Sequence, residues 1–212
     1  MLPRPPRERP HLLWLAALLC LCVGLVLIAS FAGGMWQGMR EEQRLTQVWS
    51  GEPGHHYGVP IIDPSLQHPE NGIDFAIRVP RLGYYAAVKE GISRSVLYAS
   101  PGHYPETVWP GDPGTVGVAA HNVYWINFPQ LAPGDEVDLE TRYGTFKYHV
   151  TSAVIVNPDN RSVLIPDAPG YHLTLTTCWP LWAGAFATQR YVIFTDQYYP
   201  RMEPRGHVEA LP

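Results

Sequence analysis

The sequence contains few cysteines and no block of residues with the same charge. Two of its three cysteines, Cys20 and Cys22, lie inside an apolar segment, so Cys178 is the single thiol in the rest of the 212 residues. An internal disulfide is therefore excluded there, and a zinc site built from paired cysteines has no ligands. The formal net charge is −4. Because nucleic-acid binding depends on clustered basic residues, this composition argues against a nucleic-acid partner.

What the sequence does contain favours β structure with many turns. Proline occurs 22 times and glycine 19 times, and aromatic residues make up 12% of the chain, which favours short strands over long helices. Alternating apolar residues predict strands, and two short segments predict helical turns. Strands are expected at 75–79, 84–88, 116–121, 137–141, 145–156, 171–178 and 190–194, and helical segments at 93–99 and 127–131. Seven or eight strands with one or two short helices predict a mainly β domain, built as a closed or nearly closed barrel.

An apolar segment near the N-terminus is long enough to cross a membrane. Residues 12–39 carry no charge, and about 20 apolar residues suffice for a transmembrane helix. The arginines upstream favour a cytoplasmic N-terminus, with the bulk of the chain outside the cytoplasm. We therefore expect a single-pass protein of the cell membrane with an extracytoplasmic domain. Its expected parts are a cytoplasmic tail (1–11), a transmembrane signal anchor (12–36), a juxtamembrane helix and linker (37–72), a folded domain (73–199) and a C-terminal tail (200–212).

The anchor has one competing interpretation, which is a cleaved signal peptide. Residues 30–32 form an acceptable cleavage site, but the apolar stretch is longer than the roughly 7–15 residues typical of a signal peptide. The linker is predicted from the many prolines and glycines between residues 50 and 72. His55 and His56 lie in this linker, and we expect them to be solvated because no cluster of carboxylates or cysteines is near them in the sequence.

Three strand ends carry residues suited to acyl transfer. Residues 171–178 alternate so that Leu173 and Leu175 face the core, whereas Cys178 lies on the opposite face near the end of the strand. His121 closes the strand 116–121, and Arg190 opens the strand 190–194. A thiolate is a strong nucleophile, a histidine can exchange its proton, and an arginine can hold a carbonyl or an oxyanion with its fork of donors. If the three ends converge, the chain has the groups needed to cut and remake a peptide bond.

Each of these residues also has an ordinary structural interpretation. Cys178 could be a buried, inert side chain, and Arg190 could be a salt-bridge partner on an edge strand. His172 is a rival for the base, but it lies six residues from Cys178, or about 20 Å along an extended strand. His103 and His149 are further candidates. For each histidine the alternative is a surface ring or a locally hydrogen-bonded ring.

The same residues resemble the motifs of the sortases, a family of membrane-anchored cysteine transpeptidases of Gram-positive-type cell surfaces. The segment Thr174-Leu175-Thr176-Thr177-Cys178 resembles the family's TLxTC motif, in which the cysteine is the nucleophile. His121 and Arg190 match the family's histidine and arginine in their order along the chain. The resemblance covers about residues 73–199. The segment that follows Cys178 is most similar to class D sortases, with class E next.

The resemblance implies a closed eight-stranded β-barrel and a reaction in two steps. Sortases cut a C-terminal sorting signal on a surface protein, usually between Thr and Gly or Ala, and hold the acyl part as a thioester. An amine acceptor, from a cell-wall precursor or a pilin lysine, then takes the acyl group. The resemblance implies Cys178 as the nucleophile, His121 as the general acid and base, and Arg190 as the stabiliser of the substrate carbonyl and oxyanion. Substrate contacts are expected at Thr177, Trp179 and Asn122. No cofactor and no metal are expected.

The sequence departs from the family's pattern next to the base, where Ala120-His121-Asn122 stands in place of the usual Gly-His-Arg. Two other functions remain open. Another cell-wall cysteine peptidase would usually place its cysteine before its histidine, at the start of a helix, which is not the order here. A membrane-tethered β-domain that binds peptide without chemistry would need no reactive thiol. A groove for an apolar sorting motif could be lined by Trp109, Trp125, Trp179 and Trp182.

Overall fold

The computed structural model describes residues 10–51 and 60–201, and the chain divides into two compact units, Met1–Arg40 and Glu41–Pro212. The described part of the first unit is the apolar portion of helix α1 (Pro10–Gly51), whose large apolar side chains are mostly exposed. By length and composition alone, this helix is able to cross a membrane. Most of the expected N-terminal tail, the pair His55–His56 and the C-terminal tail from residue 202 lie outside the described residues.

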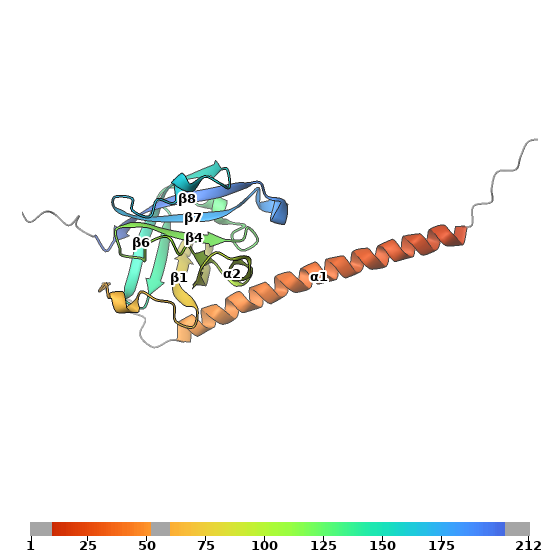
Figure 1. The fold of residues 1–212 in the computed structure, drawn as a ribbon, viewed down its shortest axis with the longest axis horizontal. Helices are drawn as coiled ribbons and strands as arrows, with labels where there is room; N and C mark the ends of the chain where they lie inside the picture. Colours follow the sequence, from red (N-terminus) through yellow and green to blue (C-terminus); the bar gives the residue numbers. More distant parts are fainter. Residues whose placement is uncertain (1–9, 52–59, 202–212) are drawn as a thin grey trace, which may run out of the picture. The chain divides into compact units, whose positions relative to one another are not determined.

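The second unit is built around a closed barrel of eight strands (Figure 1), in the order β1-β2-β3-β4-β7-β8-β6-β5. This closure confirms the expected fold class. Neighbouring strands are antiparallel except for β2 with β3 and β4 with β7, which are parallel. The strands are β1 (Ile73–Val79), β2 (Tyr84–Glu90), β3 (Gly102–His103), β4 (Gly114–Ala120), β5 (Glu136–Thr141), β6 (Gly144–Val156), β7 (Tyr171–Trp179) and β8 (Gln189–Tyr199). The short helices are η1 (Pro64–Leu66), η2 (Pro80–Leu82), α2 (Arg94–Ala99), η3 (Phe128–Gln130), η4 (Arg161–Val163) and η5 (Leu181–Phe186).

Strand β3 is the element that the alternation pattern does not predict. Its two residues lie in a stretch expected to be loop, yet they pair with β2 on one side and with β4 on the other. Two residues are too few to show any periodicity, so this strand is fixed by its neighbours. Gly102 is required there, because an added Cβ would lie 2.1 Å from the carbonyl oxygen of Gly91.

Apolar side chains from alternate strand positions fill the inside of the barrel. Leu173 and Leu175 in β7 are 0% and 1% exposed, so their predicted core face is confirmed. Each such side chain contributes about 1.5–3 kcal/mol by leaving water. Strand β7 ends at Trp179, directly before a proline that has no N–H to continue the ladder. The other large buried side chains include Phe75, Ile77, Trp125, Phe128, Leu139, Phe146 and Tyr148.

The last turns of α1 belong to the barrel unit. Leu45 and Trp49 are 3% and 0% exposed, and with Glu42 and Thr46 they occupy positions i, i+3, i+4 and i+7 on one helix face. The described part of the expected linker also contacts the barrel, because Ile61 donates its N–H to a carbonyl in the β5–β6 turn at 3.0 Å. Residue 73 begins the first barrel strand, but the compact unit begins at residue 41.

Candidate active site

The ends of β4, β7 and β8 bring the three expected reactive residues to neighbouring positions. Cys178 on β7 is paired directly with Arg190 on β8. On the other side of β7, Thr177 is paired with Ala120, the last residue of β4, and His121 follows Ala120 as Cys178 follows Thr177. Paired residues in a sheet present their side chains to the same face, with Cβ atoms about 5 Å apart. Cys178 and Arg190 are therefore neighbours on one face of the sheet, and His121 directly follows the end of the adjacent strand. We call these three positions the row.

The alternation within β7 explains why the thiol does not point into the core. Leu173 and Leu175 face inward, so Thr176 and Cys178 face the other side of the sheet. The Thr176 hydroxyl is hydrogen-bonded to the hydroxyl of Tyr104 at 2.9 Å. Tyr104 therefore covers this outer face next to the row. Cys178, at the end of the strand, is partly exposed and is not part of a disulfide. A partly exposed thiol on a rigid strand can be reached by a substrate.

His121 is partly buried, and its ring has no hydrogen-bond partner among the residues that the structure describes. Burial lowers the pKa of His121, and the positive charge of Arg94 in α2 lowers it further. The imidazole is therefore mostly neutral at pH 7, the state in which a ring nitrogen can accept a proton. The backbone carbonyl of His121 accepts hydrogen bonds from the N–H groups of Tyr124 (3.0 Å) and Trp125 (3.2 Å), so a closed turn follows this residue.

Arg190 is also partly exposed, and its guanidinium donates to the carbonyl of the adjacent Gln189 at 3.2 Å. Within the described ranges, no carboxylate lies within ion-pair distance of Arg190. Its other N–H groups can therefore be offered to a carbonyl oxygen of a ligand. An open hollow of about 800 Å³ lies beside it, lined by Gln189 and residues 155–160.

Two of the three residues expected to contact the substrate form hydrogen bonds within the protein through their polar side-chain atoms. Thr177 is 3% exposed, and its hydroxyl donates to the last carbonyl of β4 at 2.9 Å. Asn122 is also 3% exposed, and its amide donates to the carbonyl of Leu181 at 2.7 Å. Trp179 is partly exposed and packs against Tyr191, with 5.5 Å between ring centroids. Thr177 and Asn122 therefore hold β4 and the β7–β8 connection in place beside the row.

The tryptophans proposed to line a groove differ in their surroundings. Trp125 is 1% exposed and stacks on Phe128 with ring centroids 4.2 Å apart, so the groove role is wrong for this residue because it belongs to the core. Trp109 packs edge-on against Phe75 and a histidine ring. Trp182, in η5 shortly after the cysteine, is 86% exposed. Only side chains with exposed area can contact a substrate, which leaves Trp182 and the partly exposed Trp109 and Trp179 as candidates.

The rival histidines His172 and His149 are held away from the row. His172 lies at the opposite end of β7 from the cysteine, with Nδ1 2.7 Å from a carboxylate oxygen of Asp196. His149 lies within β6 and stacks on the ring of Tyr198, with centroids 3.9 Å apart. Among the described histidines, His121 is the one that directly follows β4 at the end where this strand is paired with Thr177 of β7.

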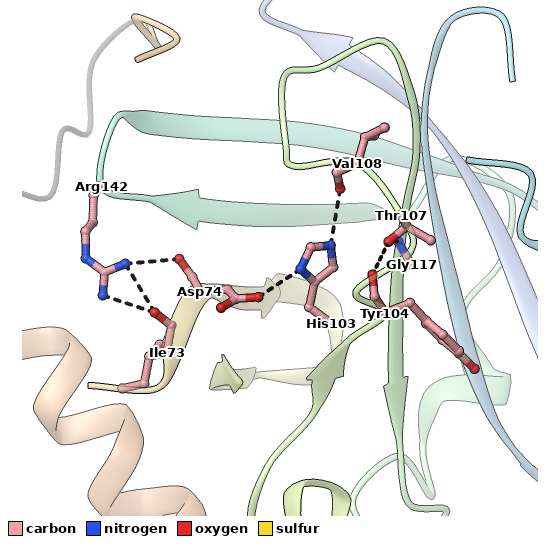
Figure 2. Close-up of polar contacts among 8 residues, drawn as sticks. All are labelled: Ile73, Asp74, His103, Tyr104, Thr107, Val108, Gly117 and Arg142. Carbon is pink, nitrogen blue, oxygen red and sulfur yellow. Dashed lines mark hydrogen bonds and ion pairs between the residues drawn. The ribbon is translucent and has the colours of Figure 1, made fainter. Parts of the chain in front are cut away.

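The third rival, His103, is a hydrogen-bonded ring, but it is buried rather than at the surface, and one of its two partners is distant in the sequence. His103 is 2% exposed, with Nδ1 2.8 Å from Oδ2 of Asp74 and Nε2 3.2 Å from the carbonyl of Val108 (Figure 2). A carbonyl only accepts, so Nε2 carries a proton. Arg142 donates to the carbonyls of Asp74 and Ile73 in the same cluster. The carboxylate partner is 29 residues away in the sequence, which no local motif reveals.

The described residues contain no group of three or more His, Cys, Asp or Glu side chains able to hold a metal ion. The chemistry offered by the row is that of a nucleophile, a proton acceptor and a fixed cation, side by side. These three groups are suited to acyl transfer at a carbonyl carbon.

A family model described as the sortase domain matches residues 77–198. The match covers more than half of the chain and includes the whole row. The chain belongs to the sortase family. It is 28% identical to sortase D of Bacillus subtilis (strain 168) over 128 residues, which make up 59% of this chain and 65% of that protein. It is 31% identical to sortase SrtE1 of Streptomyces coelicolor over 164 residues, which make up 67% of this chain and 45% of that protein. Each match thus spans less than two thirds of the relative's length.

Solved sortases share the fold of this chain. The sortase D5 transpeptidase of Clostridium perfringens superposes with a TM-score of 0.62, covering 74% of this chain and 98% of that one, at 21% sequence identity. At this identity the likeness shows the fold alone. The family resemblance inferred from the motifs is therefore confirmed, with both sortase D and sortase E among the relatives.

Proposed function

We propose that this sortase is a membrane-anchored cysteine transpeptidase that cuts a C-terminal sorting signal and transfers the acyl part to an amine. The thiolate of Cys178 attacks the carbonyl carbon of a Thr–Gly or Thr–Ala bond. The carbon–nitrogen bond then breaks, and the leaving amine takes a proton from His121. The acyl group remains on Cys178 as a thioester. The observation that supports this proposal is the row of histidine, cysteine and arginine across β4, β7 and β8.

His121 moves the proton in both steps. Its lowered pKa leaves the ring mostly neutral at pH 7, so it can take the proton of the Cys178 thiol and give it to the leaving amine. In the second step the acceptor amine attacks the thioester and loses a proton to the same ring. The carbon–sulfur bond breaks, and the thiol regains the proton from His121. The catalyst thus ends in its starting state.

Arg190 supplies the charge that the reaction needs at the carbonyl oxygen. Each step passes through a tetrahedral intermediate whose oxygen carries negative charge, and fixed donors at that point lower the barrier. The guanidinium is planar and permanently charged, so it can hold this oxygen with two N–H groups. Its place directly opposite Cys178 in the ladder supports this role.

The anchoring and the partners follow from the same proposal. Helix α1 would cross the cell membrane once, with the N-terminus in the cytoplasm and the barrel outside it, because the arginines precede the apolar stretch. The donor substrates would be surface proteins with a C-terminal sorting signal. The acceptor would be an amine on a cell-wall precursor or a pilin lysine.

The test is turnover of peptides with a Thr–Gly or Thr–Ala bond in the presence of hydroxylamine, which captures the acyl group. The parent should form the hydroxamate, and Cys178→Ala should lose about 10³-fold or more of the rate. Arg190→Lys should lose about 10²-fold, because an ammonium does not reproduce the fork of donors. Cys22→Ala removes a thiol elsewhere in the chain and serves as the matched control.

The proposal is wrong if Cys178→Ala is as active as the parent. A parent whose Cys178 does not react with a thiol-directed vinyl sulfone, and which binds peptide without cutting it, would favour the non-catalytic β-domain instead.

A further inference from the structure

The base of helix α1, residues 41–51, is seated on the barrel by one face. Leu45 and Trp49 are buried, and the hydroxyl of Thr46 accepts the N–H of Ala87 in β2 at 3.2 Å. The guanidinium of Arg142 lies over the Trp49 ring, 4.9 Å from its centroid. Apolar burial, a hydrogen bond and a cation–π contact thus act on the same three turns. The helix base therefore has a defined position on this unit.

From this position Glu42 reaches a chain of aromatic rings. Its carboxylate accepts a hydrogen bond from the hydroxyl of Tyr84 at 2.7 Å. The Tyr84 ring packs edge-on against Phe128, with centroids 5.3 Å apart, and Phe128 stacks on Trp125 at 4.2 Å. Phe128 and Trp125 are each 1% exposed. Close-packed rings in a dry core have few alternative arrangements, so a shift at Tyr84 is passed on to Trp125.

The chain of rings ends at the turn that His121 begins. The N–H groups of Tyr124 and Trp125 both donate to the His121 carbonyl, and the hydroxyl of Tyr124 donates to the carbonyl of Tyr98 in α2. Burial, together with the nearby charge of Glu42, raises the pKa of Tyr124 to about 12. The charge of Glu42 thus lies close enough to this turn to act on Tyr124.

We propose that Glu42 is a positioning residue for His121, acting from the helix base through Tyr84 and the rings of Phe128 and Trp125. The pair of Glu42 and Tyr84 keeps the turn after β4 in place, and the turn keeps the imidazole next to the thiol of Cys178. The helix that carries the membrane-spanning segment is then also a support of the active site. This inference rests on the proposed function, because it takes His121 to be the base.

The test uses the full chain in detergent micelles, with Cys20→Ala and Cys22→Ala so that Cys178 is the single thiol. Glu42→Ala should lower kcat about tenfold and leave KM within about twofold, since a loosely placed base slows the chemistry more than it weakens binding. Glu42→Gln should restore most of kcat, because its amide oxygen accepts the same hydrogen bond. The exposed neighbour in Gln43→Ala is the matched control.

Tyr84→Phe keeps the ring and removes the hydroxyl, so it should reproduce the loss seen in Glu42→Ala. The double variant should lose no more than either single variant, because both act through one hydrogen bond. A second readout is the pH dependence of Cys178 alkylation, which reports the imidazole beside the thiol and should change in Glu42→Ala but not in Gln43→Ala.

The outcomes separate the two proposals. If the parent turns over peptide and Glu42→Ala matches Gln43→Ala in kcat and in the alkylation profile, the positioning role is overturned and the proposed function stands. A fall in melting temperature with an unchanged kcat would also overturn it, since that result describes a structural role. If the parent turns over no peptide but the alkylation profile still changes in Glu42→Ala, the positioning stands and the transpeptidase proposal fails.

Discussion

Two clusters in the barrel contain the same pair of residue types, one histidine and one arginine, but they differ in burial and in hydrogen bonding. In the buried cluster, His103 lies between a carboxylate and a carbonyl, and Arg142 donates to backbone carbonyls (Figure 2). In the row, Arg190 is paired with Cys178, His121 follows the end of the adjacent strand, and both side chains are partly exposed. The first cluster holds the β1 and β3 segments together, whereas the side chains of the row keep exposed area that a ligand can reach.

The partners of a side chain, rather than its type, distinguish a structural histidine such as His103 from one able to react, as we propose for His121. Both nitrogens of His103 are engaged, so the ring cannot turn or exchange a proton without leaving buried polar atoms unpaired. In the described structure His121 is partly buried and its ring has no hydrogen-bond partner, so the ring can exchange a proton without leaving a buried polar atom unpaired. We therefore expect removal of the His103 ring to lower the stability of the barrel, and removal of the His121 ring to lower the rate of the proposed reaction.

The largest expected effect is on turnover. His121→Ala should lower kcat/KM about 10³-fold, because general acid–base catalysis by one side chain contributes about 10²–10⁴-fold. The free energy of unfolding should change by less than about 1 kcal/mol, because the ring makes no hydrogen bond in the described structure. Hydroxylamine-coupled peptide turnover and urea unfolding measure the two quantities on the same preparation. Retained turnover in His121→Ala would contradict the distinction between His103 as a structural residue and His121 as the proposed base.

The second effect is on stability. His103→Ala should lower the free energy of unfolding by about 3–5 kcal/mol, because it leaves the carboxyl of Asp74, 1% exposed, without its ring partner. His172→Ala is the matched control, since its partner Asp196 has 60% of its side chain exposed. Loss of that surface pair should cost less than about 1 kcal/mol. Equal costs for the two variants, measured by urea unfolding, would contradict the difference in burial on which the comparison rests.

The smallest effect is on the titration of the His121 ring, whose pKa is lowered first by burial. The positive charge of Arg94 opposes protonation of His121 and so lowers its pKa. Arg94→Gln removes this charge, so the pKa of His121 should rise toward its usual value, and the ring should gain its proton at a higher pH than in the parent. NMR titration of the His121 ring measures this shift.

Arg81→Gln is the control for this titration, because that guanidinium binds Asp135 instead. The Arg81→Gln variant should leave the titration midpoint of His121 unchanged from that of the parent. A midpoint that moves down in Arg94→Gln, or that moves equally in both variants, would show that His121 is not subject to the charge of Arg94.

Much of the barrel could be predicted from the sequence because its strands are amphipathic. The alternation in β7 indicated both the core leucines and the outward cysteine, and the end of that strand followed from the proline after Trp179. The neighbouring positions of His121, Cys178 and Arg190 were expected from strand ends and from the family's motif. The ladder pairs Thr177 with Ala120 and Cys178 with Arg190. Short-range patterns sufficed to place these strand ends because each residue's position depends on its own strand.

The remaining features depend on contacts between distant residues. Asp74 and His103 are 29 positions apart, and Glu42 and Tyr84 are 42 apart. The periodicity of one segment cannot reveal such partners, so the burial of His103 against Asp74 could not be predicted from the sequence. The helix base was likewise expected only as a juxtamembrane extension, because its buried face consists of just Glu42 and three further residues in an otherwise polar stretch. Strand β3 is held by its neighbours alone.

The account depends most on a covalent bond between Cys178 and the acyl part of a sorting peptide. The direct measurement is rapid acid quenching of the full chain with such a peptide, followed by mass spectrometry of the digested protein. The account predicts an adduct with the mass of the acyl fragment on the peptide that contains Cys178, released by hydroxylamine and much reduced in Arg190→Lys. Peptide cleavage with no adduct on Cys178, or cleavage that persists in Cys178→Ala, would contradict it.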